Sequence, residues 1–445
     1  MPMDLWAPYV PSDKKPWTRQ RVVHLHRRAG FAATWAELDR DLQDGPGKAV
    51  AGLLTGKANA TVAKEFDTTN AFLCDTAVTQ CEIDRLKAGW FYRFLLSPHP
   101  LLEKLTLLWH DHFATANSKV ADVRLMRRQN DTLRQHAMGK FAPLLKSAVC
   151  EPALLLYLDA QTNRKGHANE NLARELMELF TLGVGNYSEA DVKEVARALT
   201  GWSVEEGRFI EIAEDHDDGE KTIFGTKARF TGASLVELLL KQPAVADRVA
   251  KKLIRQFFGE GGVPANAAKQ LADGLRERDL DVAWAVGAVL NSRLFFDDAN
   301  VRKRVLCPVE FVVGSARLLE LFDPAPNTLA MADWSARMGQ DVFDPPNVGG
   351  WPFGRKWVHS RSLIARANCV TALVAGTISG RRVAYDPVAQ ANKYGFGAAP
   401  ADVLTFHHRL LFGVDPTAEA RKRLEPLGPT TLVTALLASP EAQLG

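Results

Sequence analysis

The sequence predicts a mainly α-helical protein: a large helical body, a small β-hairpin or ordered loop near 205–232, and an irregular loop rich in proline and tryptophan near 323–360. Apolar residues recur at helical spacing along most of 17–322 and again along 361–445. Short alternating runs near 205–232 favour strands, and 46% hydrophobic with 24% charged residues is an ordinary globular composition. We therefore expect a main helical domain over 17–322, the loop 323–360 packed on it, and a C-terminal helical cap over 361–445.

Capping residues set the helix boundaries in the first third of the chain. Thr34 and Glu37 form a capping-box pattern that starts one helix, and the Gly-Pro-Gly run at 45–47 predicts its end. The segment 71–96 has few helix-breaking residues and predicts one long helix. The Ser-Pro-His-Pro run at 97–100 then ends that helix and starts another.

The segment 169–200 predicts two helices joined by a turn. Leu172, Leu176 and Leu179 mark the apolar face of the first helix, so we expect all three to be buried. Gly183 suits the position after the last turn of this helix, and a capping serine starts the next one.

Charge, cysteine content and hydropathy exclude several classes of protein. The net charge of +3 is too weak for a nucleic-acid-binding protein, and we interpret the basic stretches 19–28 and 124–134 as solvated helix faces. The five cysteines form no C-x-x-C pair, so we expect no dependence on disulfides. The first ten residues lack a signal-peptide pattern, which predicts a cytoplasmic location. No run approaches the ~18 apolar residues of a membrane span, so we expect none.

Two histidines flank an aspartate in Trp109-His110-Asp111-His112. Such histidines are suited to bind a divalent metal or to transfer protons. On a regular helix, residues two apart point in nearly opposite directions, so one helix cannot present both to one metal. The alternative is one core histidine and one surface histidine.

A second cluster combines amides, carboxylates and an arginine, namely Asn169, Glu170, Asn171, Arg174, Glu175 and Glu178. Glu170, Arg174 and Glu175 are candidate catalytic groups, because neighbouring charges shift each other's pKa. Asn171 is a candidate substrate contact. The same spacing equally fits an ion-pair ladder on a solvated helix face.

Two irregular segments are further candidates for ligand binding. We assign His216 as a metal ligand, Asp217 as a catalytic group and Lys221 as a substrate contact, because loops often carry such residues. The alternative is a simple turn, which Asp-Asp-Gly favours. Trp351 and Trp357 fit either close packing or an aromatic groove for substrate.

Several of these motifs together resemble the domain-of-unknown-function family 1800. The central motif covers 169–183 and continues at 186–192 and 196–202. Shorter matching runs lie at 26–31, 109–113, 216–221, 307–311 and 345–351, so the resemblance spans about 19–370. Asp111 departs from the family pattern, in which asparagine is more usual. The resemblance implies no established reaction, but it implies a sulfatase-like partner protein and an exported context.

Two functional hypotheses follow. The first, which we slightly favour, is a hydrolase of a polymer such as a polysaccharide, assisted by a divalent metal on His110, His112 and His216. The second is a non-catalytic accessory or binding protein for the sulfatase-like partner. The sequence lacks G-x-x-x-x-G-K-[ST], G-x-S-x-G and H-E-x-x-H, which argues against the commonest nucleotide enzymes, serine hydrolases and zincins. The first hypothesis requires the histidines and carboxylates to line one shared cavity.

Overall fold

The computed structural model describes residues 4–56, 60–322, 325–378 and 383–445. This part of the chain is 63% helical, with 22 α-helices and two small two-stranded sheets, which confirms the mainly α prediction. Within it, no helix is both long enough and apolar enough to cross a membrane.

The helices of the first half are α1 (Arg19–Ala29), α2 (Trp35–Thr55), α3 (Ala60–Gln80), α4 (Ile83–Leu96), α5 (Pro100–His112), α6 (Asn117–Val120), α7 (Val123–His136), α8 (Phe141–Val149), α9 (Pro152–Tyr157), α10 (Asn171–Glu175) and α11 (Glu189–Ala198). Those of the second half are α12 (Gly232–Leu240), α13 (Pro243–Phe258), α14 (Ala265–Glu277), α15 (Val282–Asn291), α16 (Pro308–Leu318), α17 (Thr328–Arg337), α18 (Ser360–Val374), α19 (Pro387–Lys393), α20 (Pro400–Phe412), α21 (Ala418–Leu424) and α22 (Pro429–Ala438). The strands are β1 (Trp202–Glu205), β2 (Arg208–Glu211), β3 (Lys221–Ile223) and β4 (Thr226–Ala228).

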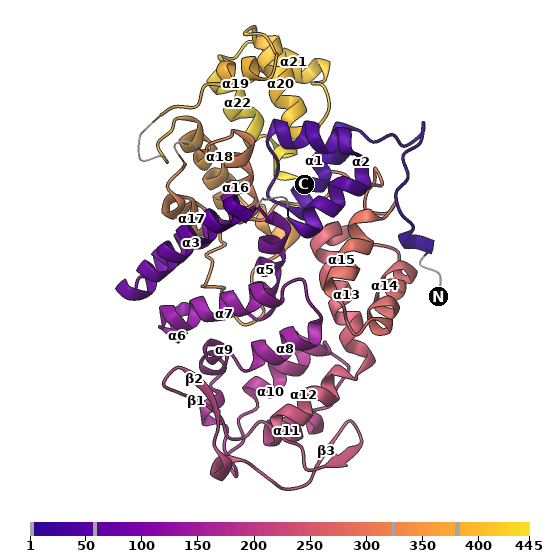
Figure 1. Ribbon diagram of the computed structural model, residues 1–445, viewed down its shortest axis with the longest axis vertical. Coiled ribbons are helices and arrows are strands. Elements are labelled where there is room, and N and C mark those ends of the chain that lie inside the picture. The colour runs from indigo at the N-terminus through magenta and orange to yellow at the C-terminus, as the bar shows by residue number, and fades with distance from the viewer. Residues whose placement is uncertain (1–3, 57–59, 323–324, 379–382) are drawn as a thin grey trace.

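The strands form two separate β-hairpins where the sequence predicted one small β element. β1 pairs antiparallel with β2, with Trp202 opposite Glu211, and β3 pairs antiparallel with β4, with Lys221 opposite Ala228. Figure 1 shows the strands near one end of the elongated molecule, α19–α22 near the other end, and α5 between them.

The predicted single helix over 71–96 is wrong, because the chain reverses between α3 and α4. Cys81 lies at the turn with a φ of 55°, a left-handed conformation that no glycine or proline announces. The two helices then pack side by side: the Asn70 amide donates to the Gly89 carbonyl at 2.9 Å, and the rings of Phe66 and Tyr92 stack with centroids 5.3 Å apart. Long-range packing therefore fixes this turn.

The helix that was predicted over 169–183 widens into a π-helix. Its first turns are α10, and the π-helix η3 (Leu176–Thr181) follows directly. Leu172 and Leu176 are buried as predicted, but Leu179 is only half-buried and packs against the edge of the core. The capping box predicted for the next helix is present, with Ser188 and Asp191 as its two partners.

The basic stretch 19–28 is not a solvated helix face. Arg21, Arg27 and Arg28 of α1 are buried, and their guanidinium groups bind carbonyls of distant segments. Arg28 donates to the carbonyls of Phe257, at the C-terminal end of α13, and Asn300. Helix ends carry unpaired carbonyls, so buried arginines here satisfy backbone groups that would otherwise be costly.

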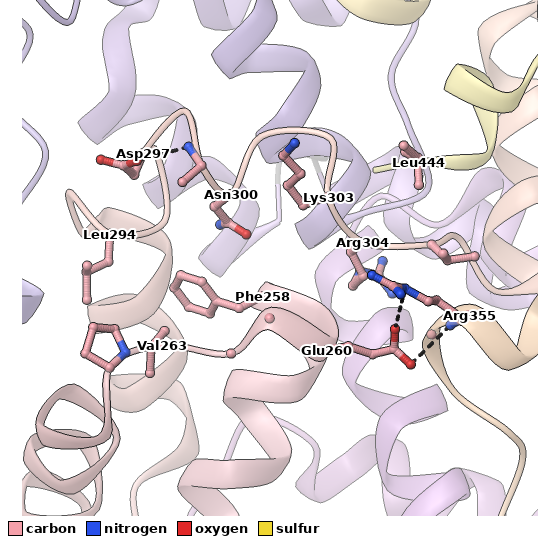
Figure 2. Close-up of a pocket in the computed structure, with 16 residues that line it drawn as sticks. Phe258, Glu260, Val263, Leu294, Asp297, Asn300, Lys303, Arg304, Arg355 and Leu444 are labelled. Carbon is pink, nitrogen blue, oxygen red and sulfur yellow. Dashed lines mark hydrogen bonds and ion pairs between the residues drawn. The ribbon is translucent and has the colours of Figure 1, made fainter.

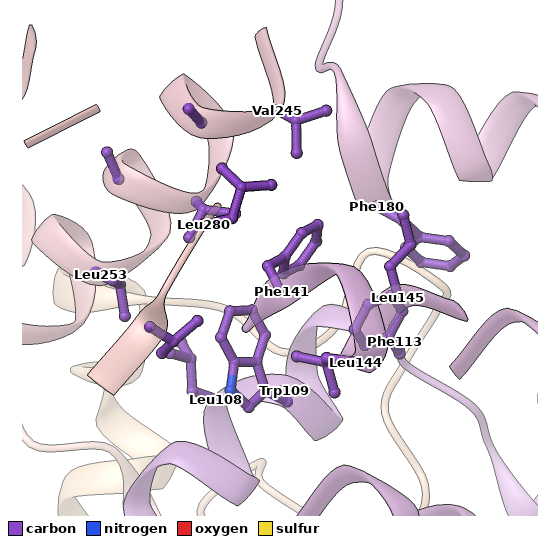
Figure 3. Packing of buried hydrophobic residues seen from close by; sticks show 14 of the residues in the cluster. Leu108, Trp109, Phe113, Phe141, Leu144, Leu145, Phe180, Val245, Leu253 and Leu280 are labelled. Carbon is purple, nitrogen blue, oxygen red and sulfur yellow. The ribbon is translucent and has the colours of Figure 1, made fainter. Parts of the chain in front are cut away.

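Buried hydrophobic residues form two clusters. Figure 3 shows part of the first cluster, in which Trp109 of α5 and Phe113, just after this helix, lie near Phe141 and Phe180. The second cluster joins α1, α4 and α16 to the C-terminal helices α18, α20 and α22. The division at 322 and 361 into a body, a loop and a cap stays a prediction.

Replacing Leu176 by alanine tests the packing of the π-helix. The side chain is fully buried, so Leu176→Ala should lower the free energy of unfolding by roughly 2–5 kcal/mol in a denaturant titration. Val184→Ala is the matched control, because Val184 is 78% exposed and should change stability by no more than about 0.5 kcal/mol. A loss below about 1 kcal/mol at Leu176 would contradict this packing.

Candidate functional site

The two histidines of the α5 motif are buried in different surroundings. His110 packs against the rings of Trp90, Phe343 and Trp351, with centroids 4.9 to 5.7 Å away, and neither ring nitrogen has a hydrogen-bond partner among the described residues. Burial lowers the pKa of His110 to about 3, so the ring is neutral at physiological pH. The His112 Nε2 atom instead lies 3.0 Å from the Phe180 carbonyl. Both rings are therefore enclosed by other parts of the chain.

His216, Asp217 and Lys221 tie down the segment between β2 and β3. The His216 Nδ1 atom lies 2.9 Å from the Thr200 carbonyl, and the buried Lys221 ammonium donates to the carbonyls of Asp217 and Gly219. Asp217 forms an ion pair with Arg197 at 2.8 Å, and this hydrogen bond lowers the pKa of Asp217 to about 2. These contacts close a loop on the end of α11.

The predicted metal ligands do not form a metal site. Figure 1 shows α5 in the middle of the molecule and β2 and β3 toward one end, and His112 and His216 each contact a different backbone carbonyl. Across the described ranges, no group of three or more His, Cys, Asp or Glu side chains is placed to hold a metal ion. The residues present therefore do not fit the divalent metal that the sequence suggested.

The carboxylates of the 169–183 motif separate into two groups. Arg174 binds Glu170 at 3.1 Å and Glu189 at 2.8 Å on a partly exposed surface, which matches the ion-pair ladder. Asn171 begins α10, and its backbone N–H donates to the Asn169 side chain at 2.9 Å. Glu175 is half-buried, and burial, helped by the nearby charge of Glu178, raises its pKa.

Asp111 holds the loop that carries the two predicted tryptophans. Its carboxylate accepts from the Trp351 backbone N–H at 2.9 Å and from the Lys252 ammonium at 2.8 Å. Gly350 has a φ of 84°, and a Cβ at this position would overlap the Asp111 carboxylate. Trp351 and Trp357 are buried, so both mainly pack the loop against the body.

Two neighbouring cavities next to this loop are lined by basic residues. Their volumes are about 600 and 550 Å³, and they share Glu260, Gly262 and Val263. We call them together the cationic cleft, since their basic lining residues are Lys251, Arg255, Lys303, Arg304, Arg355 and Lys356. Figure 2 shows the larger cavity, with Lys303 and Arg304 across from Phe258 and Val263.

Acidic groups neutralise only part of this cleft. Glu260 lies 3.5 Å from Arg355, and Asp297 pairs with Lys15 at 2.8 Å. Three further lysines that line the cleft are exposed and have no ion pair with any described residue: Lys251, Lys303 and Lys356. The unbalanced charge makes the cleft attractive to anions.

Sequence reasoning missed the cleft, although one signal for it was present. Arg248, Lys251, Lys252 and Arg255 follow the spacing of one face of α13. Arg248 donates to the Leu179 carbonyl at 3.0 Å, Lys252 binds Asp111, and the Arg255 guanidinium lies 4.2 Å from the centre of the Phe353 ring. This cationic face runs from the π-helix to the cleft.

The comparison with known families agrees with the motifs. The model of the family described as "Protein of unknown function (DUF1800)" matches residues 24–444. The chain belongs to this family. No curated protein and no solved structure matches it. Three of the runs that resemble the family meet at a small cavity of about 60 Å³ beside the cleft, lined by Asp111 of the 109–113 run, Cys307 and Glu310 of 307–311, and Trp351 of 345–351.

Glu310 is a buried anion in the wall of this small cavity. It accepts from Lys104 of α5 and from Arg304 at 2.5 Å each, and from the Cys307 backbone N–H at 2.9 Å. Burial alone would raise the pKa of Glu310, but Arg304 and Lys104 hold it well below its usual range. The Arg304 Nε atom is buried with no partner among the described residues.

Replacing Glu310 by glutamine tests this network. Glu310→Gln leaves two buried cations without a carboxylate between them, so the free energy of unfolding should fall by roughly 3–5 kcal/mol. Glu237→Gln is the control, since Glu237 forms an exposed ion pair with Lys146 and should change stability little.

The difference in stability between the wild type and Glu310→Gln should depend on pH, in a direction that the pKa of Glu310 fixes. The folded-state pKa of Glu310 lies below its usual value of 4.5, so the stabilisation is complete above about pH 4.5 and is lost as the pH falls below it. Wild-type stability should therefore fall more steeply in acid than that of Glu310→Gln. Parallel curves for the two proteins would contradict an ionised Glu310.

Proposed function

We propose that this DUF1800 protein binds an anionic polymer, such as an acidic or sulfated polysaccharide, in the cationic cleft, and that it acts as a non-catalytic accessory protein. The observation that carries the proposal is the group of three lysines, Lys251, Lys303 and Lys356, around two joined cavities; none of the three has an ion pair with a described residue. A monomeric anion would need few of these charges, whereas a chain of anionic groups can contact all of them.

The chemistry of the cleft supports a polysaccharide better than a neutral ligand. Arg255 and Phe353 present a stacked cationic and aromatic surface, which suits the flat faces of sugar rings beside their anionic groups. The buried side of the cleft contains Arg304, which Glu310 holds in place. The three lysines of the cleft are exposed, so binding should weaken as salt screens them.

The placement of the predicted catalytic groups also favours a binding role. Glu170 and Arg174 belong to a surface ladder, Asp217 is paired with Arg197, and both α5 histidines are packing residues. The resemblance implied a sulfatase-like partner, whose substrates would carry sulfate groups. A protein that holds a sulfated polymer for such a partner would account for both the binding role and the partner.

Sedimentation or calorimetric titration with dextran sulfate, using neutral dextran as the comparison, tests the proposal. We expect binding to dextran sulfate only. The double variant Lys251→Gln/Lys303→Gln should weaken binding by roughly 5- to 30-fold, if each cation contributes about 0.5–1 kcal/mol.

Lys241→Gln is the matched control, since Lys241 is exposed at the end of α12, lines neither cavity, and should leave binding unchanged. Equal binding of neutral dextran, or an equal loss with Lys241→Gln, would overturn the assignment of the cleft.

The hydrolase hypothesis keeps one specific candidate, Glu175. This half-buried carboxyl has no ion pair with a described residue, its pKa is raised by burial and by Glu178, and its charge acts on Tyr157 together with that of Asp344. A raised pKa suits a general acid that protonates a leaving oxygen, and a glycosidase pairs such an acid with a second carboxylate.

A reducing-end assay on acidic polysaccharides tests this second candidate. If the protein is a hydrolase, Glu175→Gln should lower kcat by roughly 100-fold or more, because the general acid is lost. Glu189→Gln should keep its activity, since Glu189 belongs to the surface ladder. Failure of the wild-type protein to release reducing ends from any of the polymers, or full activity of Glu175→Gln, would remove Glu175 as the acid.

A further inference from the structure

The segment 355–364, which leads into α18, exposes apolar and basic side chains together. Val358, Leu363 and Ile364 are 40%, 41% and 63% exposed. Such large aliphatic side chains are usually covered in a monomeric protein when they lie close together. The exposed basic residues of the same segment are Arg355, Lys356 and Arg361.

This segment lies in a stretch of the chain whose charged side chains are all basic. From 345 to 385 the sequence contains six arginines and lysines and no aspartate or glutamate. Lys356 and Arg361 have no ion pair with any residue in the described ranges, and the Arg355 side chain is 91% exposed despite its contact with Glu260. The local charge is therefore positive and largely unneutralised.

The first turns of α18 have one buried face and one exposed face. Ser362, Ala365 and Arg366 are buried against the body, whereas Arg361 and Ile364 point to solvent. Leu363 lies at the edge of the exposed face, and Val358 precedes the helix by two residues. Aliphatic side chains and cations are therefore exposed together along this segment.

We propose that the segment 355–364 docks onto an anionic lipid surface. Aliphatic side chains gain by leaving water for the region between headgroups and acyl chains, while arginine and lysine bind the anionic headgroups around them. A polysaccharide would use the cations but would leave Val358, Leu363 and Ile364 in water. This combination of charge complementarity and exposed aliphatic groups therefore favours a lipid surface.

The docking surface adjoins the cationic cleft. Arg355 lines the larger cavity and Lys356 lines the smaller one, so a docked protein would hold the mouth of the cleft close to the headgroups. The inference does not depend on the polymer that the cleft binds, because the aliphatic residues that carry it line neither cavity.

Co-sedimentation of the full chain with lipid vesicles tests the inference. We expect binding to vesicles of phosphatidylcholine with about 30% phosphatidylglycerol, and little binding to phosphatidylcholine alone. The double variant Leu363→Ser/Ile364→Ser should weaken binding by roughly tenfold or more, and Arg361→Gln should weaken it by a smaller factor. Val184→Ser is the control, because Val184 is 78% exposed in a different segment.

The vesicle and dextran sulfate results together distinguish binding by the segment 355–364 from binding by the cleft. Wild-type binding to neutral vesicles at the same level, no binding to anionic vesicles, or a double variant that binds as well as the wild type would each overturn the proposal. Circular dichroism of the double variant establishes that it is folded, and unchanged dextran sulfate binding by this variant would support two independent surfaces. Lys251→Gln/Lys303→Gln should weaken dextran sulfate binding by the factor given above while keeping vesicle binding. If that variant lost vesicle binding to the same extent as the aliphatic variant, the lipid contact would belong to the cleft and the proposal would fail.

Discussion

One buried carboxylate joins the parts of this protein that surround the cleft. Glu310 neutralises Lys104 of α5 and Arg304, and it also caps the start of α16. Two buried cations cannot share a space without an anion, so the positions of both segments depend on this group. Such networks often add little net stability compared with apolar packing. Their value here lies in fixing where the Arg304 guanidinium stands in the cleft wall.

The chain uses its basic residues in two distinct ways. Buried ones, such as Arg27 and Arg28, donate to backbone carbonyls of distant segments and so take the place of solvent. Exposed ones, such as Lys251 and Lys303, have no protein partner in the described part of the chain. The net charge of +3 conceals this division, because acidic residues elsewhere balance the total while the cleft is only partly neutralised.

Local signals predicted the helices well and the candidate site poorly. The capping boxes at Thr34 and Ser188 need only residues three apart, and both are present in the structure. The turn at Cys81 and the π-helix have no local marker, since tertiary packing decides both. The cleft combines Glu260, Arg304 and Arg355, which are far apart in the chain, so no local pattern reveals it. The histidine motif was misleading for a related reason: buried rings between helices carry the same sequence pattern as metal ligands.

Asp111 connects the loop at Trp351 with the charge of Lys252 on α13. The resemblance to the family implies asparagine more often at this position, and an amide oxygen would accept the Trp351 N–H as the carboxylate does. Asparagine would nevertheless leave Lys252 without its counter-ion. We therefore expect substitutions at 111 and 252 to be linked during divergence, with Gly350 unchanged because its neighbour tolerates no Cβ. Exchanging this one carboxylate oxygen for an amide nitrogen would raise the positive charge that α13 presents, and it would keep the backbone contact at Trp351.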